Sequence, residues 1–287
     1  MKFSAVIGQE PTKHRLCQMV AESRLPHAVM LCGPMGCGKM ALALAFASYL
    51  LGESDEQGNS ILSDEAKVRN AEAMLRRWEH PDLHFTFPVI RPSGTSSEHK
   101  MVSDDYMREW HGLLQDGPYF SIDEWLRRMD AANQQAIIGA GESDELIRKL
   151  TLKSYQGGYK VCVIWLPERM NQECANKLLK LLEEPPQQTV FIMVCEEPEH
   201  IIETIRSRVQ RIDVARLSTD EIQHALIKQR GLSDADARRT ARLADGNWLK
   251  ALETLNAANE NRADITTMHK NPTLFFPKNP ILPYQSF

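Results

Sequence analysis

A glycine-rich turn near the N-terminus places the strongest constraint on the fold. It reads Gly33-Pro34-Met35-Gly36-Cys37-Gly38-Lys39-Met40, and it lies between two apolar stretches, Ala28–Cys32 and Ala41–Leu51. The first stretch has the length of a buried strand and the second has the length of a helix. Glycine, four residues, glycine and lysine between a strand and a helix is the frame of a phosphate-binding loop. In such a loop, backbone N–H groups and the lysine surround an anion.

The alternative is a glycine turn without a ligand, which the flanking strand and helix disfavour. The residue after the lysine should be Ser or Thr, because its hydroxyl coordinates magnesium. Met40 stands there, and a thioether is a poor ligand for so hard a cation. The candidate phosphate-binding residues are Gly33, Pro34, Gly36, Cys37, Gly38, Lys39 and Met40.

Two further apolar runs, Val161–Leu166 and Thr189–Cys195, predict buried strands. A helix from Asn171 to Glu184 should join them, and the two prolines that follow Glu184 should end it. A short helix is expected from Pro198 to Arg206. In phosphate-binding α/β proteins, strands placed like these carry acids that hold magnesium and activate water. The first run ends instead in Trp165-Leu166, so the chain has the form of a nucleotidase core without its acidic groups.

The other elements follow from periodicity and from helix and turn signals. Three aromatic residues of the middle region have two interpretations, as a platform for stacked bases or as core packing at helical spacing, which is favoured. These residues are Trp110, Tyr119 and Trp125. Helices are predicted at Thr12–Glu22, Asp64–Glu79, Asp104–Leu114, Ser121–Ala140 and Ser143–Gln156, and a strand at Leu83–Val89.

Composition disfavours several classes of protein. The 287 residues suffice for two domains, and 43% hydrophobic with 25% charged residues is typical of a globular chain. A net charge of −4 gives no basic field over the whole chain that would attract nucleic acid. No apolar run reaches about 18 residues, so a membrane span is not expected. The six cysteines lack ligand-like spacing, which favours free thiols in a reducing cytoplasm over disulfides or a metal site.

With these motifs together, the chain resembles the AAA+ clamp-loader family of bacterial DNA polymerase III, and within it the delta-prime type of subunit. The likeness is carried by Ile7-Gly8-Gln9, His27–Lys39, Asn176–Pro186 and Arg206-Ser207-Arg208. The run Asn176–Pro186, NKLLKLLEEPP, is the most specific, because its order is hard to place in another phosphate-loop family. The resemblance implies an α/β fold: a P-loop AAA+ domain with a parallel sheet, and a small all-helical lid.

The resemblance also implies a division into domains. Residues 1–213 are expected to form the AAA+ domain with a degenerate nucleotide site. Residues 214–262 are expected to form the lid, in which Ser218 and Glu221 make a capping box. Residues 263–287 are expected to be an irregular tail, because their prolines do not fit the helical collar domain of relatives.

Compared with active subunits of the family, the chain lacks the residues for hydrolysis. The family places acids where this chain has Trp165 and Leu166, Thr at Met40, a polar residue near Cys195 and a sensor arginine at Leu249. Such losses remove the magnesium ligand, the base and the γ-phosphate contacts, so useful ATP hydrolysis is not expected. No cofactor is required, although the retained lysine leaves weak, magnesium-independent binding of ATP, ADP or phosphate open.

One retained motif is directed at another subunit. Ser207-Arg208-Val209 keeps the serine and arginine of the family's Ser-Arg-Cys motif, whose arginine is a finger in the nucleotide site of the neighbouring subunit. Arg208 is therefore the candidate catalytic residue, acting in trans, and Arg206 is expected to be structural. The alternative for both is a solvated charge at a helix C-terminus.

The implied function is that of a non-hydrolysing clamp-loader subunit in the bacterial cytoplasm. Its partners would be gamma/tau and delta-like subunits in a hetero-pentamer, and through the assembly the sliding clamp and primer-template DNA. No zinc is expected, because Gly52–Glu79 lacks the four cysteines that many relatives carry there. The intact frame Gly33–Lys39 keeps two alternatives open, a working P-loop ATPase or kinase and a nucleotide-sensing scaffold.

Overall fold

The chain is built around a five-stranded sheet. The computed structural model describes residues 1–92, 94–96 and 98–257. The strands lie in the order β2-β3-β4-β1-β5. Every pair is parallel, so the carboxyl ends of the strands share one edge of the sheet. The bounds are β1 Ala28–Cys32, β2 Leu83–Thr86, β3 Lys160–Trp165, β4 Thr189–Cys195 and β5 Gln210–Asp213.

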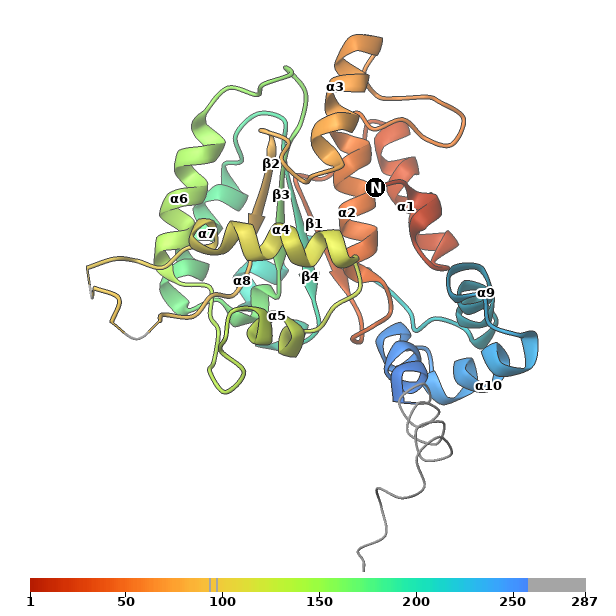
Figure 1. Ribbon diagram of the computed structural model, residues 1–287. Helices are drawn as coiled ribbons and strands as arrows, with labels where there is room; N and C mark the ends of the chain where they lie inside the picture. The colour runs from red at the N-terminus through yellow and green to blue at the C-terminus, as the bar shows by residue number, and fades with distance from the viewer. Residues whose placement is uncertain (93, 97, 258–287) are drawn as a thin grey trace, which may run out of the picture.

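Helices cover both faces of this sheet (Figure 1). Along β1, Val29 and Leu31 join the core formed with α1 to α5, whereas Ala28, Met30 and Cys32 join the core formed with α6 to α8. A parallel sheet that is buried on both faces needs such nearly continuous apolar strands. The helices are α1 Glu10–Ala21, α2 Lys39–Leu50, α3 Glu65–Leu75, α4 Met107–Asp116, α5 Ile122–Arg128, α6 Ala140–Thr151, α7 Gln172–Glu183, α8 Glu203–Arg206, α9 Thr219–Arg230 and α10 Asp234–Ala244.

The elements with strong local signals fall where the sequence predicts them. The strands Ala28–Cys32 and Thr189–Cys195 have the predicted bounds. The helix predicted from Asn171 is α7, and Asn171 is its N-cap, with its side-chain oxygen accepting the N–H of Cys174 at 2.8 Å. A capping side chain of this type satisfies one of the unpaired N–H groups that every helix start has.

The helix predicted over Ser121–Ala140 is wrong beyond Arg128. Asp130 has φ +55°, and the N–H of Ala131 bonds the carbonyl of Leu126 at 2.8 Å, which is how helices commonly end. Ile137 then forms an isolated antiparallel bridge with Val89, beyond the point where β2 ends. The apolar residues after Arg128 therefore belong to a loop that packs on the sheet domain.

The short helix predicted from Pro198 to Arg206 is divided in two. A 3-10 turn covers Pro198–His200, and α8 begins only at Glu203. Ile201 between them has an extended backbone, with φ −84° and ψ 135°, and is 4% exposed. The apolar side chain at Ile201 joins the core beside α6 and α7, and this burial interrupts the helix.

The helices after β5 form a separate small core. α9 and α10, together with a helix over residues 248–257, pack around Leu226, Ala241 and Trp248. Ser218 caps α9, and Glu221 returns the bond to the Ser218 N–H at 2.7 Å, so the predicted capping box is confirmed. The predicted lid end at 262 and the tail 263–287 lie outside the described residues.

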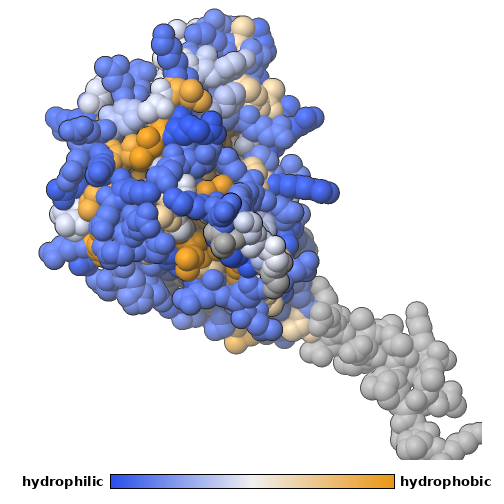
Figure 2. All heavy atoms as spheres, turned by 90° about the vertical axis from the view of Figure 1, so that its left-hand side faces the viewer, coloured by the Kyte–Doolittle hydropathy of each residue, from blue (hydrophilic) through white to orange (hydrophobic). Residues whose placement is uncertain are grey.

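The surface carries dispersed apolar side chains. The side that holds α6 and α7, at the left in Figure 1, is mostly hydrophilic with separate hydrophobic patches (Figure 2). Single exposed apolar residues are normal on a protein surface. None of the helices among the described residues has the length and hydropathy of a membrane span. The large exposed apolar residues are Met35, Ile137, Ile147, Leu152, Tyr155 and Leu243.

The stability of the fold should depend on pH through His84 of β2. Burial, and secondly Lys149, lowers the pKa of His84 from 6.5 to about 4. Below pH 6.5 the unfolded chain therefore binds a proton that the folded chain does not. We expect the free energy of unfolding to fall by roughly 2 kcal/mol between pH 6.5 and 4 through this residue.

Urea denaturation across this pH range measures the effect. His84→Gln should flatten the profile, whereas His14→Gln, on an exposed histidine, should leave it unchanged. Burial raises the pKa of Glu142, so this residue makes the free energy of unfolding rise as the pH falls. Because Glu142 is present in every variant, its contribution cancels when the profiles of wild type and variant are subtracted. Identical pH profiles for wild type and His84→Gln would contradict the prediction.

Candidate functional site

The predicted phosphate-binding loop connects β1 to α2. Gly36 and Gly38 have φ of +75° and +97°, in the left-handed region that favours glycine. A Cβ at Gly33 would lie 2.3 Å from the carbonyl oxygen of Val214. Glycine is therefore required at these positions by the backbone conformation and by close packing.

Lys39 makes its contacts within the chain. It is 4% exposed, and its Nζ donates to the carbonyl of Pro34 at 2.7 Å and lies 3.4 Å from a carboxylate oxygen of Glu196. A lysine at this position of a phosphate loop contacts the β- and γ-phosphates. Here the carboxylate of Glu196 is the partner of Lys39, in the place that a phosphate would take. An entering phosphate would have to displace Glu196, because the two anions repel each other.

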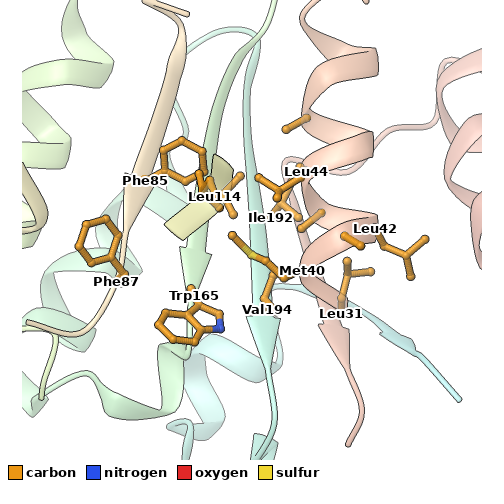
Figure 3. Packing of buried hydrophobic residues seen from close by; sticks show 14 of the residues in the cluster. Leu31, Met40, Leu42, Leu44, Phe85, Phe87, Leu114, Trp165, Ile192 and Val194 are labelled. Carbon is orange, nitrogen blue, oxygen red and sulfur yellow. The ribbon is translucent and has the colours of Figure 1, made fainter. Parts of the chain in front are cut away.

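Apolar side chains fill the space beside the loop. The cavity there has a volume of about 20 Å³, whereas small-molecule sites reach about 300–1,000 Å³ and one water needs about 15 Å³. Met40, Trp165 and Val194 lie together at this point (Figure 3). Tyr119 and the lid residue Leu249 line the same cavity. The predicted replacements Met40, Trp165 and Leu249 thus meet in one place.

Trp165 belongs to an aromatic cluster in the core. Its ring centroid lies 5.4 Å from that of Trp110 and 5.1 Å from that of Phe120. Leu166, which follows it, is 3% exposed. Trp110 and Trp125 have no exposed surface, so core packing is confirmed for these two and the base-stacking platform is wrong.

Tyr119 is a site residue that the sequence did not reveal. Its hydroxyl accepts the N–H of Ile7 at 2.9 Å, and a Cβ at Gly38 would lie 3.5 Å from its ring. Burial raises the pKa of the Tyr119 phenol, so the group is neutral. The ring therefore covers the loop from the side of the N-terminal segment.

The helical residues after β5, which were predicted to form a lid, contact the loop directly. The N–H of Trp248 donates to the carbonyl of Gly36 at 3.0 Å. A Cβ at Gly36 would overlap the side-chain oxygen of Asn247, at 1.8 Å. Gln9 adds a second connection, because its amide donates to the carbonyls of Cys37 at 3.0 Å and Ala215 at 2.7 Å. Direct hydrogen bonds therefore connect the loop to the residues after β5 and to the N-terminal segment.

Cys195, the expected γ-phosphate-sensing position, is not brought to this cavity. Its side chain lies in the core with α6 to α8, on the opposite face of the sheet from Met40 and Trp165. Hydrogen bonding with the neighbouring thiol of Cys32, and then burial, raises the pKa of Cys195. The residue that reaches the loop from the end of β4 is the next one, Glu196.

Arg208 follows α8 and is not among the residues that line the loop cavity. Its side chain is 38% exposed, and Nη2 lies 2.8 Å from a carboxylate oxygen of Glu183. Arg206 pairs with Glu199 at 3.1 Å, and its Nε is buried without a hydrogen-bond partner among the described residues. The two side chains are similarly exposed, 35% for Arg206 and 38% for Arg208, and they differ in that the Nε of Arg206 is a buried atom.

The comparisons with known proteins decide the family. The model of a family described as "DNA polymerase III, delta subunit" matches residues 8–218. The chain belongs to this family. The match includes the phosphate loop, the run Asn176–Pro186 and Arg208.

Two known proteins resemble the chain over most of its length. DNA polymerase III subunit delta' of Bacillus subtilis is 25% identical over 279 residues, which cover 94% of this chain and 68% of that protein. DNA polymerase III subunit tau of the same organism is 26% identical over 269 residues, which cover 92% of this chain and 39% of that protein. The chain thus spans about two fifths of tau and about two thirds of delta'.

A solved structure agrees with the fold. The RuvB Holliday junction branch migration motor of Thermotoga maritima superposes with a TM-score of 0.51 at 14% identity, covering 92% of this chain and 66% of that one. At this identity the likeness concerns the fold alone. The predicted α/β fold, an AAA+ P-loop domain with a parallel sheet and a helical portion, is confirmed.

The structure therefore divides the predicted site residues into two places. Four of the predicted loop residues line one cavity with Trp165 and Leu249, and Arg208 does not line it; the four are Gly36, Gly38, Lys39 and Met40. The sequence missed Tyr119, Glu196 and Asn247. Glu196 had a usable signal, because residues just after parallel strands line the ligand crevice of open α/β sheets. Tyr119 had none, since it is one of the three aromatic residues for which the sequence favours core packing.

Proposed function

We propose that the chain is a non-hydrolysing subunit of the bacterial DNA polymerase III clamp loader, and that it donates Arg208 to the nucleotide site of a neighbouring subunit. One contrast carries this proposal. The cavity beside the chain's own phosphate loop has about 20 Å³, whereas the Arg208 side chain is 38% exposed. Family membership supports the assembly, and the contrast supports the role within it.

The chemistry of phosphoryl transfer supports the absence of hydrolysis. Catalysis of this reaction consists of positioning the phosphates and stabilising charge, mostly through magnesium and fixed cations. Met40 supplies a thioether in place of the hydroxyl that would hold the metal. Trp165 and Leu166 are buried apolar residues where the family's acids would be. Glu196, a carboxylate at the loop cavity, pairs with Lys39.

Our proposal places the chain in a hetero-pentamer with gamma/tau and delta-like subunits in the cytoplasm, contacting the sliding clamp and primer-template DNA through that assembly. The relatives named tau and delta' support these partners. Native mass spectrometry of the chain mixed with gamma/tau and delta subunits tests the proposal. A loader lacking the chain should fail to load the clamp on primed DNA, and failure of the chain to associate with the subunits would contradict it.

The isolated chain should neither turn over ATP nor bind it in a magnesium-dependent way. The filled cavity and the Lys39–Glu196 pair leave binding weaker than a Kd of about 1 mM. Steady-state ATP turnover and calorimetric titration with ADP, each with and without magnesium, measure this. Lys39→Ala is the control variant. Turnover that Lys39→Ala abolishes would favour the alternative of a working P-loop ATPase.

A further inference from the structure

We propose that Glu183 is the positioning residue for Arg208, holding its guanidinium at the surface in the orientation from which it reaches a neighbour's phosphate. This inference rests on the finger role proposed above for Arg208. It accounts for the end of the run Asn176–Pro186, where two glutamates precede two prolines. The phosphate loop does not explain why these residues are present, because none of them lines the cavity beside it.

Three contacts hold the Arg208 side chain. Nη2 lies 2.8 Å from a carboxylate oxygen of Glu183. Nη1 donates to the carbonyl of Thr204 at 3.0 Å and to the hydroxyl of Ser207 at 3.4 Å. A guanidinium has five N–H donors in a rigid plane. These contacts fix the plane and still leave donors for an oxygen of a phosphate.

The position of Glu183 at the end of α7 is unfavourable by itself. α7 ends at Glu183, where the helix carries the negative end of its dipole, and an acid is disfavoured there. Pro185 ends the helix so that the carboxylate stays at this point. The charge of Arg208 offsets the repulsion. The pair thereby joins the C-terminal end of α7 to the residues that follow α8.

The pair is too exposed to matter much for folding. The two side chains are 38% and 49% exposed, and an ion pair in such surroundings contributes little to stability. The ion pair instead restricts the conformations of the Arg208 side chain. A long side chain that is already held loses less conformational entropy when it binds a ligand. Removing the carboxylate should therefore weaken the finger without weakening the fold.

A double-mutant cycle in the reconstituted clamp loader with the full chain tests this. The finger-dependent ATPase is the clamp- and DNA-stimulated rate that Arg208→Ala removes. Glu183→Gln should lower the kcat of the finger-dependent ATPase by about tenfold, with a smaller change in the KM for ATP. In the Arg208→Ala background, Glu183→Gln should change nothing further, because it acts through the missing guanidinium.

The adjacent carboxylate offers a matched control. Glu184 is exposed and makes no ion pair within the described part of the chain, so Glu184→Gln should leave the finger-dependent rate unchanged. The urea midpoint of Glu183→Gln should equal that of the wild type. Nuclear magnetic resonance of the free chain should show a lower order parameter for the Arg208 Nε–H in Glu183→Gln than in the wild type.

The outcomes separate this inference from the proposed function. An unchanged rate in Arg208→Ala overturns both the finger and its positioning. A lowered rate in Arg208→Ala with an unchanged or raised rate in Glu183→Gln overturns the positioning role alone, and a raised rate would mean that Glu183 restrains Arg208. A further loss from Glu183→Gln in the Arg208→Ala background also overturns it, as does an unchanged order parameter.

Discussion

Arg208→Ala should lower ATP turnover at the neighbouring subunit's site by about a thousandfold in a reconstituted clamp loader. A finger arginine stabilises the charge that develops on the transferring phosphate, and alanine removes that charge and its planar donors. The clamp- and DNA-stimulated ATPase rate of the whole assembly should therefore fall by at least the part of the rate that this one site contributes. The rate is measured with clamp and primed DNA present, after native mass spectrometry has shown that the variant still assembles.

Two variants control this experiment. Arg208→Lys keeps the charge without the fork of donors and should recover only part of the rate. Arg206→Ala removes the neighbouring arginine, which pairs with Glu199, and should leave the ATPase unchanged in assembled complexes. An assembly with Arg208→Ala that hydrolyses ATP at the wild-type rate would exclude the finger role.

Trp165→Asp should lower the free energy of unfolding by more than about 4 kcal/mol and should create no ATPase. The substitution restores the acid that the family's active subunits have at this position. Removing a buried tryptophan costs about 3–5 kcal/mol, and the carboxylate would be buried without a partner beside Trp110 and Phe120. The measurement is urea denaturation of the purified chain, followed by an ATP turnover assay.

Trp165→Phe is the matched control, because it keeps an apolar ring at the position. It leaves a smaller cavity and should cost about 1–2 kcal/mol. Wild-type stability of Trp165→Asp together with magnesium-dependent ATP turnover would contradict the prediction. That result would mean that one residue, and not the packing around it, limits ATP turnover at the phosphate loop.

Strong local patterns made a large part of the fold predictable. The apolar run Ala28–Cys32, the glycines of the loop, the Asn171 cap and the Ser218–Glu221 capping box each specify their element through contacts within a few residues. The middle of the chain was less predictable. The helix expected to Ala140 ends at Arg128, because the apolar residues beyond it pack on the sheet domain instead of continuing a helical face.

The candidate site shows the same division. The order of the residues establishes which groups are present: a lysine in a phosphate loop, a methionine and a tryptophan in place of a hydroxyl and an acid, and an arginine after serine. What surrounds these groups depends on how the chain folds. Tyr119 covers the loop, Glu196 pairs with Lys39, and Glu183 holds Arg208. Each of these contacts joins separate elements, and side-chain periodicity within one element carries no information about which residue of another element will meet it.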